Sequence, residues 1–566
     1  MTVEKLITDH IDIWSSALQT RSTAGRGSNG KIDLYGIKKL RELILELAVR
    51  GKLVPQDPND EPASELLKRI AAEKAELVKQ GKIKKQKPLP EISEDEKPLE
   101  LPEGWDYSRL GELFNIVYGK SLSNSDLVDS GYEVFGANGI IGFYSSYLYE
   151  TEQLLVSCRG AYSGKPNVSP KYCFVTSNSL VLENSWKYLC QAYCFHALTI
   201  ADKNKIVTGS AQPQVTTTNL EPFIIAIPPL KEQLRISNKV NELMSLCDQL
   251  EQQSLSSLDA HQQLVETLLA TLTDSLNAEE LAENWARVSQ YFDMLFSTEA
   301  SIDTLKQTIL QLAVMGKLVQ QDPNDEPASE LLKRIEQEKA QLMKEGKIKK
   351  QKPLPPVSDE EKPFELPEGW ECCRFGSLFK SFTNGLYKQE KFYTDKGIIS
   401  LRMYNIQDGT IDFNGIRRVE VNEIELEQYK LEEGDLLINR VNSKELVGKT
   451  AIVPRFHEPL LFESMNIRAK PINKQIDARY LNLFMQSAYV KEMLLSYAKE
   501  AIGQASINQQ QISNIVLPLP PVCEQRKIIE ITNNLLVLIS TLKSHLQSAQ
   551  QTQLHLADAL TDAALN

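Results

Sequence analysis

The chain has 566 residues, of which 42% are hydrophobic and 24% charged, and its formal net charge is −12. This balance is typical of a folded protein and excludes a mostly disordered chain, while the length predicts three or four domains. The acidic charge counts against a nucleic-acid partner, because domains that bind nucleic acids are usually basic.

The amino terminus and the cysteines indicate the compartment. The first fourteen residues, MTVEKLITDHIDIW, carry four charges where a secretory leader needs an apolar run, and no stretch approaches 18 successive apolar residues. Eight irregularly spaced cysteines are typical of reduced thiols. We therefore expect a cytoplasmic protein with no membrane partner.

A segment of 55 residues occurs twice. Gly51–Trp105 aligns without gaps on Gly316–Trp370 with 44 identical positions, and QDPNDEPASELLKRI recurs unchanged at 56–70 and 321–335. Apolar residues spaced three and four apart precede both copies and predict one helix face in each: Ile37, Leu40, Ile44 and Leu47, then Ile302, Leu305, Ile309 and Leu312. Each copy ends in a proline-rich strap that we expect to be extended, at 86–104 and 351–369.

Two globular regions, 105–228 and 370–520, follow the straps. Their similarity is reduced to short pairs: RLGELF with RFGSLF, LVSCR with LLINR, and KYLCQ (187–191) with RYLNL (479–483). Two copies in one chain stay alike where they do the same job, so the repeated segments share a task. The divergent regions are expected to have separate targets.

A long helix is predicted after each globular region, behind the similar strings IPPLKEQLRI and LPPVCEQRKI. Heptad-like apolar stripes indicate a coiled-coil-like seam: Ile236, Leu243, Cys247, Leu250, Leu264 and Leu268, then Ile528, Leu535, Ile539, Leu542, Leu556 and Leu560. The alternative is a helix packed on its own domain.

Short strings that imitate catalytic motifs fail on spacing. GKS (119–121) and GKT (448–450) lack the glycine that a phosphate-binding loop needs five residues earlier, where Phe114 and Ser443 stand. Cys190, Cys194 and His196 resemble metal ligands, but the second copy offers Asn482, Gln486 and Ala488 by this alignment, so a buried helix face is the better interpretation. We expect a chain that is not an enzyme, with no catalytic or metal-binding residues.

The globular regions contain turns that mix amide, hydroxyl, aromatic and basic side chains. Arginine can bridge guanine O6 and N7, and asparagine or glutamine can bridge adenine N6 and N7, whereas lysine suits phosphates. The candidate DNA contacts in the first region are Tyr118, Gly119, Lys120, Ser121, Arg159, Ser163, Lys165, Ser210, Gln212 and Gln214. Those in the second region are Asn384, Tyr387, Lys388, Arg402, Tyr404, Asn405, Arg440, Asn442, Ser443, Lys444, Lys449, Ser506, Asn508 and Gln509. Ordinary polar surface loops remain the alternative.

Four of these residues lead the candidates: Arg159, Arg402, Asn405 and Arg440. Arg159 and Arg440 are expected in equivalent turns after a strand, which favours a shared role such as a phosphate contact. A salt-bridged structural arginine is the alternative for each.

The paired layout resembles one family. Two variable regions alternating with near-duplicate helical segments, which carry ELAVRGKLVPQDPNDEPASELLKRI and the LPPV-x-EQ type of string, are similar to specificity (S) subunits of type I restriction–modification systems over essentially the whole chain. The resemblance implies an α+β protein with two mixed α/β target recognition domains, each reading half of a bipartite site in double-stranded DNA. The domains would be separated by long paired antiparallel helices in a tandem repeat with a pseudo-twofold cyclic arrangement.

The resemblance also implies partners. Two methyltransferase (M) subunits would dock on the helices and restriction (R) subunits would join them; S-adenosylmethionine, ATP and Mg would belong to those partners, with no cofactor on this chain. The expected boundaries are 1–104 (helices and strap), 105–228, 229–369 (central helices and strap), 370–520 and 521–566, with the last helix pairing with the first. The seam from Ile236 to Leu268 would span roughly 48 Å and set the half-site spacing. The competing hypothesis is a two-headed adaptor that does not bind DNA.

Overall fold

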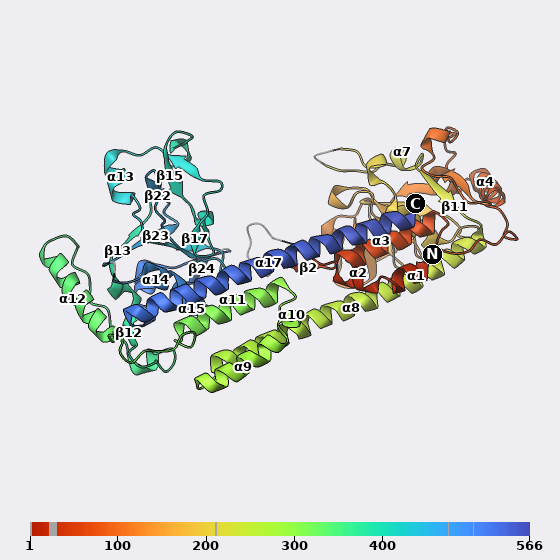
Figure 1. The fold of residues 1–566 in the computed structure, drawn as a ribbon. Helices are drawn as coiled ribbons and strands as arrows, with labels where there is room; N and C mark the ends of the chain where they lie inside the picture. Colours follow the sequence, from red (N-terminus) through yellow and green to blue (C-terminus); the bar gives the residue numbers. More distant parts are fainter. Residues whose placement is uncertain (1–2, 22–30, 210–211, 474, 502, 566) are drawn as a thin grey trace. The chain divides into compact units, whose positions relative to one another are not determined.

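The structure is a computed structural model that describes residues 3–21, 31–209, 212–473, 475–501 and 503–565. The chain divides into two compact units (Figure 1). Unit 1 comprises Met1–Gln19, Asp33–Leu255 and Gln550–Asn566, and unit 2 comprises Thr20–Ile32 and Ser256–Ala549. Both units combine helices with β-sheets, which confirms the α+β class.

Unit 1 is built around a four-stranded sheet of order β4-β10-β7-β8. Its strands are β4 (Asn115–Tyr118), β7 (Leu154–Ser157), β8 (Pro166–Val168) and β10 (Ser179–Glu183). A three-stranded sheet of β5 (Tyr132–Phe135), β6 (Ile140–Tyr144) and β9 (Phe174–Val175) and the pair β3 (Asp106–Arg109) with β11 (Ile224–Ile227) accompany it. Its larger helices are α3 (Tyr35–Val49), α4 (Ala63–Lys79), α6 (Gln191–Ile200) and the first part of α8 (Leu230–Asp274). The central strands β7 and β10 are buried almost throughout, as apolar strands inside a domain should be.

Unit 2 repeats this plan with a sheet of order β13-β23-β19-β21. These strands are β13 (Phe379–Asn384), β19 (Leu436–Asn439), β21 (Thr450–Ile452) and β23 (Asn466–Pro471). A second sheet contains β14 (Tyr393–Thr394), β18 (Arg417–Val419), β15 (Ile398–Leu401) and β22 (Leu460–Phe462), and β12 (Glu371–Arg374) pairs with β26 (Val516–Leu519). Its main helices are α9 (Ala278–Gln290), α11 (Glu299–Val314), α12 (Ala328–Lys344), α14 (Ala478–Met485), α15 (Ala488–Tyr497) and the first part of α17 (Val522–Leu565).

The repeated sequence forms the same clasp in both units. The backbone N–H of Ala63 donates to Gly104 O at 2.8 Å, and Ala328 N–H donates to Gly369 O at 2.8 Å, so the DPNDEPA turn is fastened to the LPEGW end of the strap. The next residue of the strap then donates from its indole to a buried glutamate at the start of the long helix: Trp105 to Glu232 at 3.0 Å and Trp370 to Glu524 at 2.9 Å.

Each strap is also anchored by one buried arginine. Arg109 donates to Pro90 O and Pro222 O and forms an ion pair with Glu96. Arg374 does the same with Pro355 O, Asn514 O and Glu361. The hydrogen bond from Arg109 holds the pKa of Glu96 at about 2. The near-identity of the two copies therefore reflects one packing arrangement that is used twice.

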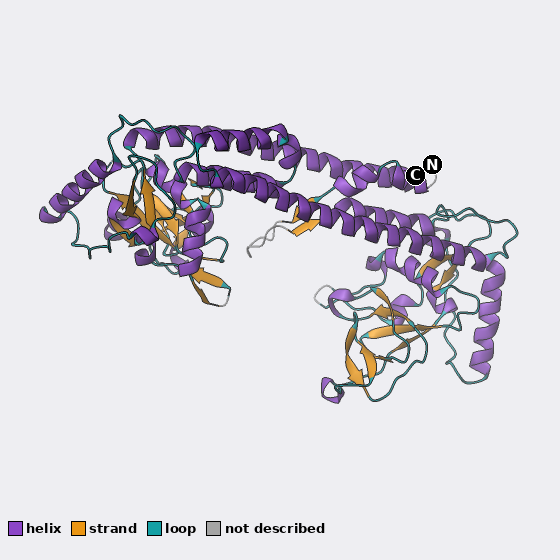
Figure 2. Cartoon of the chain, turned by 90° about the horizontal axis from the view of Figure 1, so that it is seen from below, coloured by secondary structure: helices purple, strands orange, loops and turns teal. Residues whose placement is uncertain are grey.

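The last turns of α17 lie against α3 within unit 1. Tyr35 Oη donates to Asp558 Oδ1 at 2.7 Å, Lys39 Nζ lies 3.5 Å from the same carboxylate, and Lys52 Nζ donates to Leu565 O at 2.7 Å. Figure 2 shows the two chain ends close together. The expected pairing of the first and last helices is thus present.

The predicted heptad stripes are correct only in part. Ile236, Leu243 and Cys247 are buried, but Leu264 is 49% exposed and its neighbour Val265 is buried instead. The same shift occurs in α17, where Leu556 is 45% exposed and Ala557 is buried. An α-helix has 3.6 residues per turn, so a face drifts away from a strict seven-residue repeat.

Within unit 2 the long helices do pack together. One hydrophobic core joins Val265, Leu269 and Leu272 of α8 to Leu305 and Ile309 of α11, and includes Ile539 of α17. The α8 and α17 helices run in opposite directions (Figure 1). The paired helices therefore share a core here, as predicted: α17 contributes Ile539 of the predicted stripe, whereas α8 contributes Val265 and Leu269, one residue away from it.

The predicted alignment of KYLCQ with RYLNL is wrong by five residues. Tyr193 Oη donates to Ala226 O at 2.8 Å, and Tyr480 Oη donates to Pro518 O at 2.8 Å. The backbone N–H groups of Cys190 and Asp477 likewise donate to Gln233 and Gln525. Both equivalent pairs are 287 residues apart, rather than the 292 that the short strings implied.

With this alignment Cys194 corresponds to Leu481, and His196 to Leu483. All four side chains are buried. Two of the candidate metal ligands, Cys194 and His196, are therefore buried positions of α6, as that interpretation expects, whereas Cys190 is half-buried and directly precedes the helix.

Candidate nucleic-acid interface

The variable loops of unit 1 gather at one edge of its four-stranded sheet. β4 and β7 both pair antiparallel with β10, so their carboxyl ends lie at the same edge. The loops 117–125 and 158–167 leave from these ends. The third loop, 209–219, joins them through an antiparallel bridge between Arg159 and Gln214 and a hydrogen bond from Gly160 N–H to Pro213 O of 3.0 Å.

Unit 2 gathers its loops at the corresponding edge. β13 and β19 both pair antiparallel with β23, which brings the loops 383–391 and 439–449 together. Loop 503–511 joins through pairing of β20 (Val441–Asn442) with β25 (Gln504–Ser506). The fourth loop, 401–409, is tied in by the N–H of Glu463, which donates to Leu401 O at 3.0 Å.

A glycine marks the point where the first loop leaves each sheet. A Cβ on Gly119 would overlap the carbonyl oxygen of Thr176, and a Cβ on Gly385 would overlap that of Glu463. The second copy has one extra residue before this glycine, and β13 absorbs it as an irregularity between Phe379 and Ser381. Gly119 is thus required for backbone packing rather than for contact with a ligand.

Most candidates in unit 1 lie on the exposed edge. Tyr118, Lys120, Ser121, Arg159, Lys165, Gln212 and Gln214 are exposed. Ser163 is buried and donates from Oγ to Pro213 O at 2.7 Å, so it holds two loops together. Ser210 lies outside the described residues.

The cations of this edge are not neutralised by acidic neighbours. Among the described residues the side chains of Lys120 and Arg159 make no hydrogen bond or ion pair, and Lys165 lies over the Tyr162 ring at 5.7 Å. Exposed cations without an acidic partner suit contacts with phosphates.

The candidates in unit 2 are more heavily paired. Lys388 forms an ion pair with Glu425 at 2.7 Å, and Lys449 Nζ donates to Gln407 at 3.0 Å. Burial lowers the pKa of Lys449. Three of the remaining polar candidates hold the loops together: Gln509 donates to Asn384, Asn442 donates to Asn439, and Asn508 caps the helix at 509–513. Two others are at least partly buried, since Ser443 Oγ is buried and Ser506 is half-buried. Tyr387, Tyr404 and Lys444 are exposed.

Asn405, one of the four leading candidates, does not lie at the exposed loop edge. Asn405 is fully buried, where its Nδ2 donates to Asp412 O at 2.9 Å and its Oδ1 accepts from Arg402 N–H at 2.9 Å. It shapes the 401–409 loop from inside rather than offering an amide to a ligand. The signal that misled was composition, since asparagine is common both in binding loops and in turns that use its side chain.

The expected equivalence of Arg159 and Arg440 is wrong by one position. The N–H of Cys158 donates to Asn178 O and that of Arg440 donates to Met465 O, so Arg440 corresponds to Cys158. A shift of one residue turns a side chain to the opposite side of an extended chain. Accordingly Arg159 is exposed, whereas Arg440 donates from Nη1 to Ser464 O at 3.2 Å and its Nε is buried.

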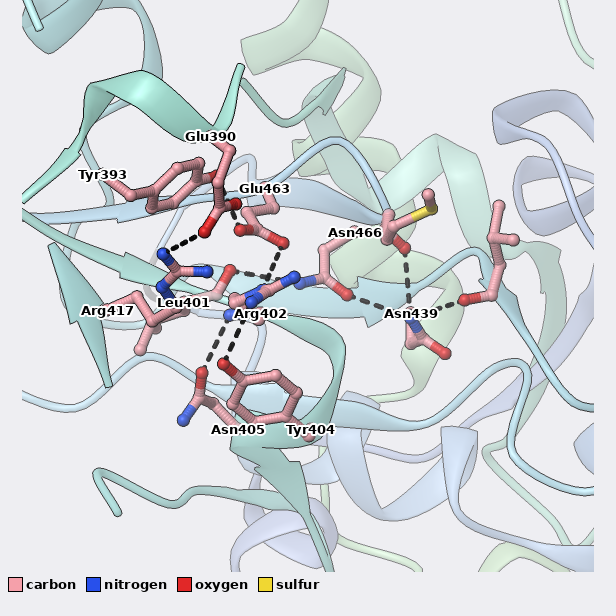
Figure 3. A network of polar contacts seen from close by, with 12 residues as sticks. Glu390, Tyr393, Leu401, Arg402, Tyr404, Asn405, Arg417, Asn439, Glu463 and Asn466 are labelled. Carbon is pink, nitrogen blue, oxygen red and sulfur yellow. Dashed lines mark hydrogen bonds and ion pairs between the residues drawn. The ribbon is translucent and has the colours of Figure 1, made fainter. Parts of the chain in front are cut away.

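Arg402 stands at the centre of a polar network in unit 2 (Figure 3). Its Nε donates to Glu463 Oε2 at 2.8 Å and its Nη1 donates to Tyr404 Oη at 3.3 Å. Glu463 also accepts from Tyr393 Oη at 2.6 Å. Beside it, Arg417 donates to Glu390 at 2.5 Å.

Sequence reasoning missed Glu463, Tyr393 and Arg417, because they lie outside the loops chosen by composition. Only the structural alignment reveals Glu463: it places the turn ESMN (463–466) on TSNS (176–179), where the central strand of each sheet begins. In unit 2 that turn contacts the loops 383–391, 401–409 and 439–449 through the backbone of Leu386, Leu401 and Arg440.

Two further findings limit the chemistry of the described part of the chain. It contains no group of three or more His, Cys, Asp or Glu residues arranged to hold a metal ion. None of its helices is long and apolar enough to cross a membrane. The loop edges offer directional hydrogen-bonding groups on a rigid sheet, which suits recognition.

Comparisons with known proteins agree with this arrangement. The model of the type I restriction modification DNA specificity domain matches residues 102–260 and again 367–549. The EcoEI specificity subunit of the type I restriction enzyme from Escherichia coli is 51% identical over 598 residues, covering 100% of both chains. The EcoAI specificity subunit from Escherichia coli is 50% identical over 600 residues, again covering 100% of both.

Proposed function

The chain belongs to the family of type I restriction–modification DNA specificity subunits, and on this premise we propose that each unit reads one half of a bipartite site in double-stranded DNA. The chain is the non-catalytic specificity component of such a complex; methylation and cleavage belong to other subunits. The competing hypothesis of a two-headed adaptor without a DNA target is not favoured by this membership.

One observation supports the assignment of one half-site to each unit. The two units place four-stranded sheets of the same order on the same clasp and strap, and fill the same sheet edge with loops of unrelated sequence. Identical supports with different loops are what two readers of different half-sites need. The edge of unit 1 reads one half-site and the edge of unit 2 reads the other.

The partners follow from the same proposal. Two methyltransferase subunits dock on the duplicated helical segments, restriction subunits join them, and the long helices set the spacing between half-sites. S-adenosylmethionine, ATP and Mg are held by those partners, and the complex acts in the cytoplasm. Cationic surfaces on the partners offset the net charge of −12, which by itself would repel DNA.

Exchanging one reader tests this proposal. Residues 105–228 are replaced by the corresponding segment of a relative with another specificity, and the methylated sites are sequenced in cells that carry the partner subunits. One half-site should change and the other should persist. A change in both half-sites, or in neither, would contradict the assignment of one reader to each unit.

A further inference from the structure

We propose that Arg402 binds the O6 and N7 edge of a guanine in the half-site read by unit 2, with Glu463 and Tyr404 as its positioning residues. This inference rests on the proposed function and deepens it, because it assigns one base contact to one side chain. It concerns the network of Figure 3, in which Arg402 and Tyr404 come from loop 401–409 and Glu390 from loop 383–391.

The guanidinium of Arg402 is held from two sides. Glu463 accepts from Nε at 2.8 Å, and the Tyr404 ring lies under the guanidinium carbon at 5.2 Å. Arginine recognises guanine through a planar fork of two donors, and a fork whose direction is fixed loses less entropy on binding. Both contacts therefore prepare this side chain for directional recognition.

The free donors are those that a guanine requires. A guanidinium has five N–H groups. Glu463 occupies the one on Nε and Tyr404 Oη one of the two on Nη1, whereas Nη2 has no partner among the described residues. One N–H of Nη1 and both N–H groups of Nη2 remain, and one from each nitrogen forms an end-on pair that matches the O6 and N7 acceptors in the major groove.

Glu463 is itself fixed. Its side chain is 12% exposed, its second oxygen accepts from Tyr393 Oη at 2.6 Å, and its backbone N–H donates to Leu401 O at 3.0 Å. The carboxylate cannot follow a moving arginine without breaking these bonds. It acts as a rigid support for Arg402.

The charge of the network argues for a base rather than a phosphate. Arg402 is balanced by Glu463 and Arg417 by Glu390, so this cluster has little net attraction for the phosphate backbone. Its direction-specific donors remain effective at close range. The unpaired Arg159 in unit 1 presents the opposite case, a cation free to follow a phosphate.

The neighbouring Arg418 provides a matched control. It lies on β18 next to Arg417, and its side chain is 30% exposed, close to the 31% of Arg402. Both of its η nitrogens donate to Glu458, at 2.8 and 2.9 Å. No fork is left for a base, so its replacement removes an arginine and an ion pair without removing a reader.

The experiment selects bound duplexes from a random double-stranded library, using the purified complex of the full chain with its methyltransferase subunits. Arg402→Gln and Arg402→Lys should lose preference for guanine at one position of one half-site by about 10-fold or more, with every other position unchanged. Arg418→Gln should select the wild-type site.

The positioning role has its own readout. Glu463→Gln keeps an acceptor for Arg402 Nε and should retain most of the guanine preference, whereas Glu463→Ala should lose it at the same position as Arg402→Gln. Loss of preference at several unrelated positions in Glu463→Ala would show a merely structural role and contradict the assignment.

Three results would overturn the proposal for Arg402. One is an unchanged site in both Arg402 variants. Another is uniformly weaker binding with unchanged base preferences, which would make Arg402 a phosphate contact. The third is the same relaxation in Arg418→Gln. If the wild-type complex itself enriches no sequence, the proposed function fails instead, so the two failures are distinguishable.

Discussion

His196→Leu should make the protein less sensitive to acid. His196 is 8% exposed on α6, its Nε2 has no hydrogen-bond partner, and burial lowers its pKa to about 4. The equivalent residue in the other copy is Leu483, so leucine is already compatible with this position in the shared plan. The exchange therefore removes a titrating group from a site that accommodates an apolar one.

The magnitude follows from linkage between protonation and folding. Below a pH of about 6.5 the unfolded chain binds a proton at this histidine, whereas the folded chain binds it only near pH 4, so the free energy of unfolding falls as the pH decreases through that range. When the pH decreases from 7.5 to 5.0, this one residue should lower the free energy of unfolding by about 2 kcal/mol. Other groups contribute equally in the wild type and the variant.

Urea unfolding at pH 7.5 and 5.0 measures the effect. The wild type should lose about 2 kcal/mol more than His196→Leu over this interval. The mirror variant Leu483→His should gain a comparable acid sensitivity in unit 2. If the wild type and His196→Leu lose the same free energy, the histidine titrates in the folded protein as it does in solution and the account of its burial is wrong.

Two further predictions concern the clasp and the unpaired cations. Trp105→Phe should cost about 1.5–3 kcal/mol more stability than Trp370→Phe in calorimetric unfolding. It removes the one side-chain hydrogen bond that Glu232 makes within the described residues, whereas Glu524 keeps a bond of 3.0 Å from Gln321. Equal costs would contradict this reasoning. Arg159→Gln and Lys120→Gln should each weaken DNA binding uniformly across sequences and reduce the slope of log affinity against log salt by about 1; a changed base preference would instead make either residue a reader.

The shared framework was predictable because identity over the repeated segments is high. Any element built on the DPNDEPA turn or the LPEGW strap end can be transferred from one copy to the other without choosing an alignment. The apolar spacing of α3 and α11 also fixed their buried faces, since Ile37, Leu40, Ile302 and Leu305 are all buried as expected.

The sites were less predictable because single insertions decide them. β13 contains one extra residue, and the sequence alignment of the two copies was wrong by five residues before α6. It was also wrong by one residue at Arg440, which put that side chain on the opposite side of the strand end. Composition identified the loops that converge, but it could not separate an amide that holds a loop, such as Asn405, from one that is presented to a ligand. The supporting carboxylate of Glu463 becomes visible only when strands distant in sequence are paired.

The most direct test of the central claim is a genome-wide map of N6-methyladenine in the source cell with this gene intact and deleted. Deletion should remove methylation from one bipartite motif and leave all other motifs unchanged. An identical map, in cells whose methyltransferase partner is expressed and active, would contradict the claim that this chain specifies where that partner acts.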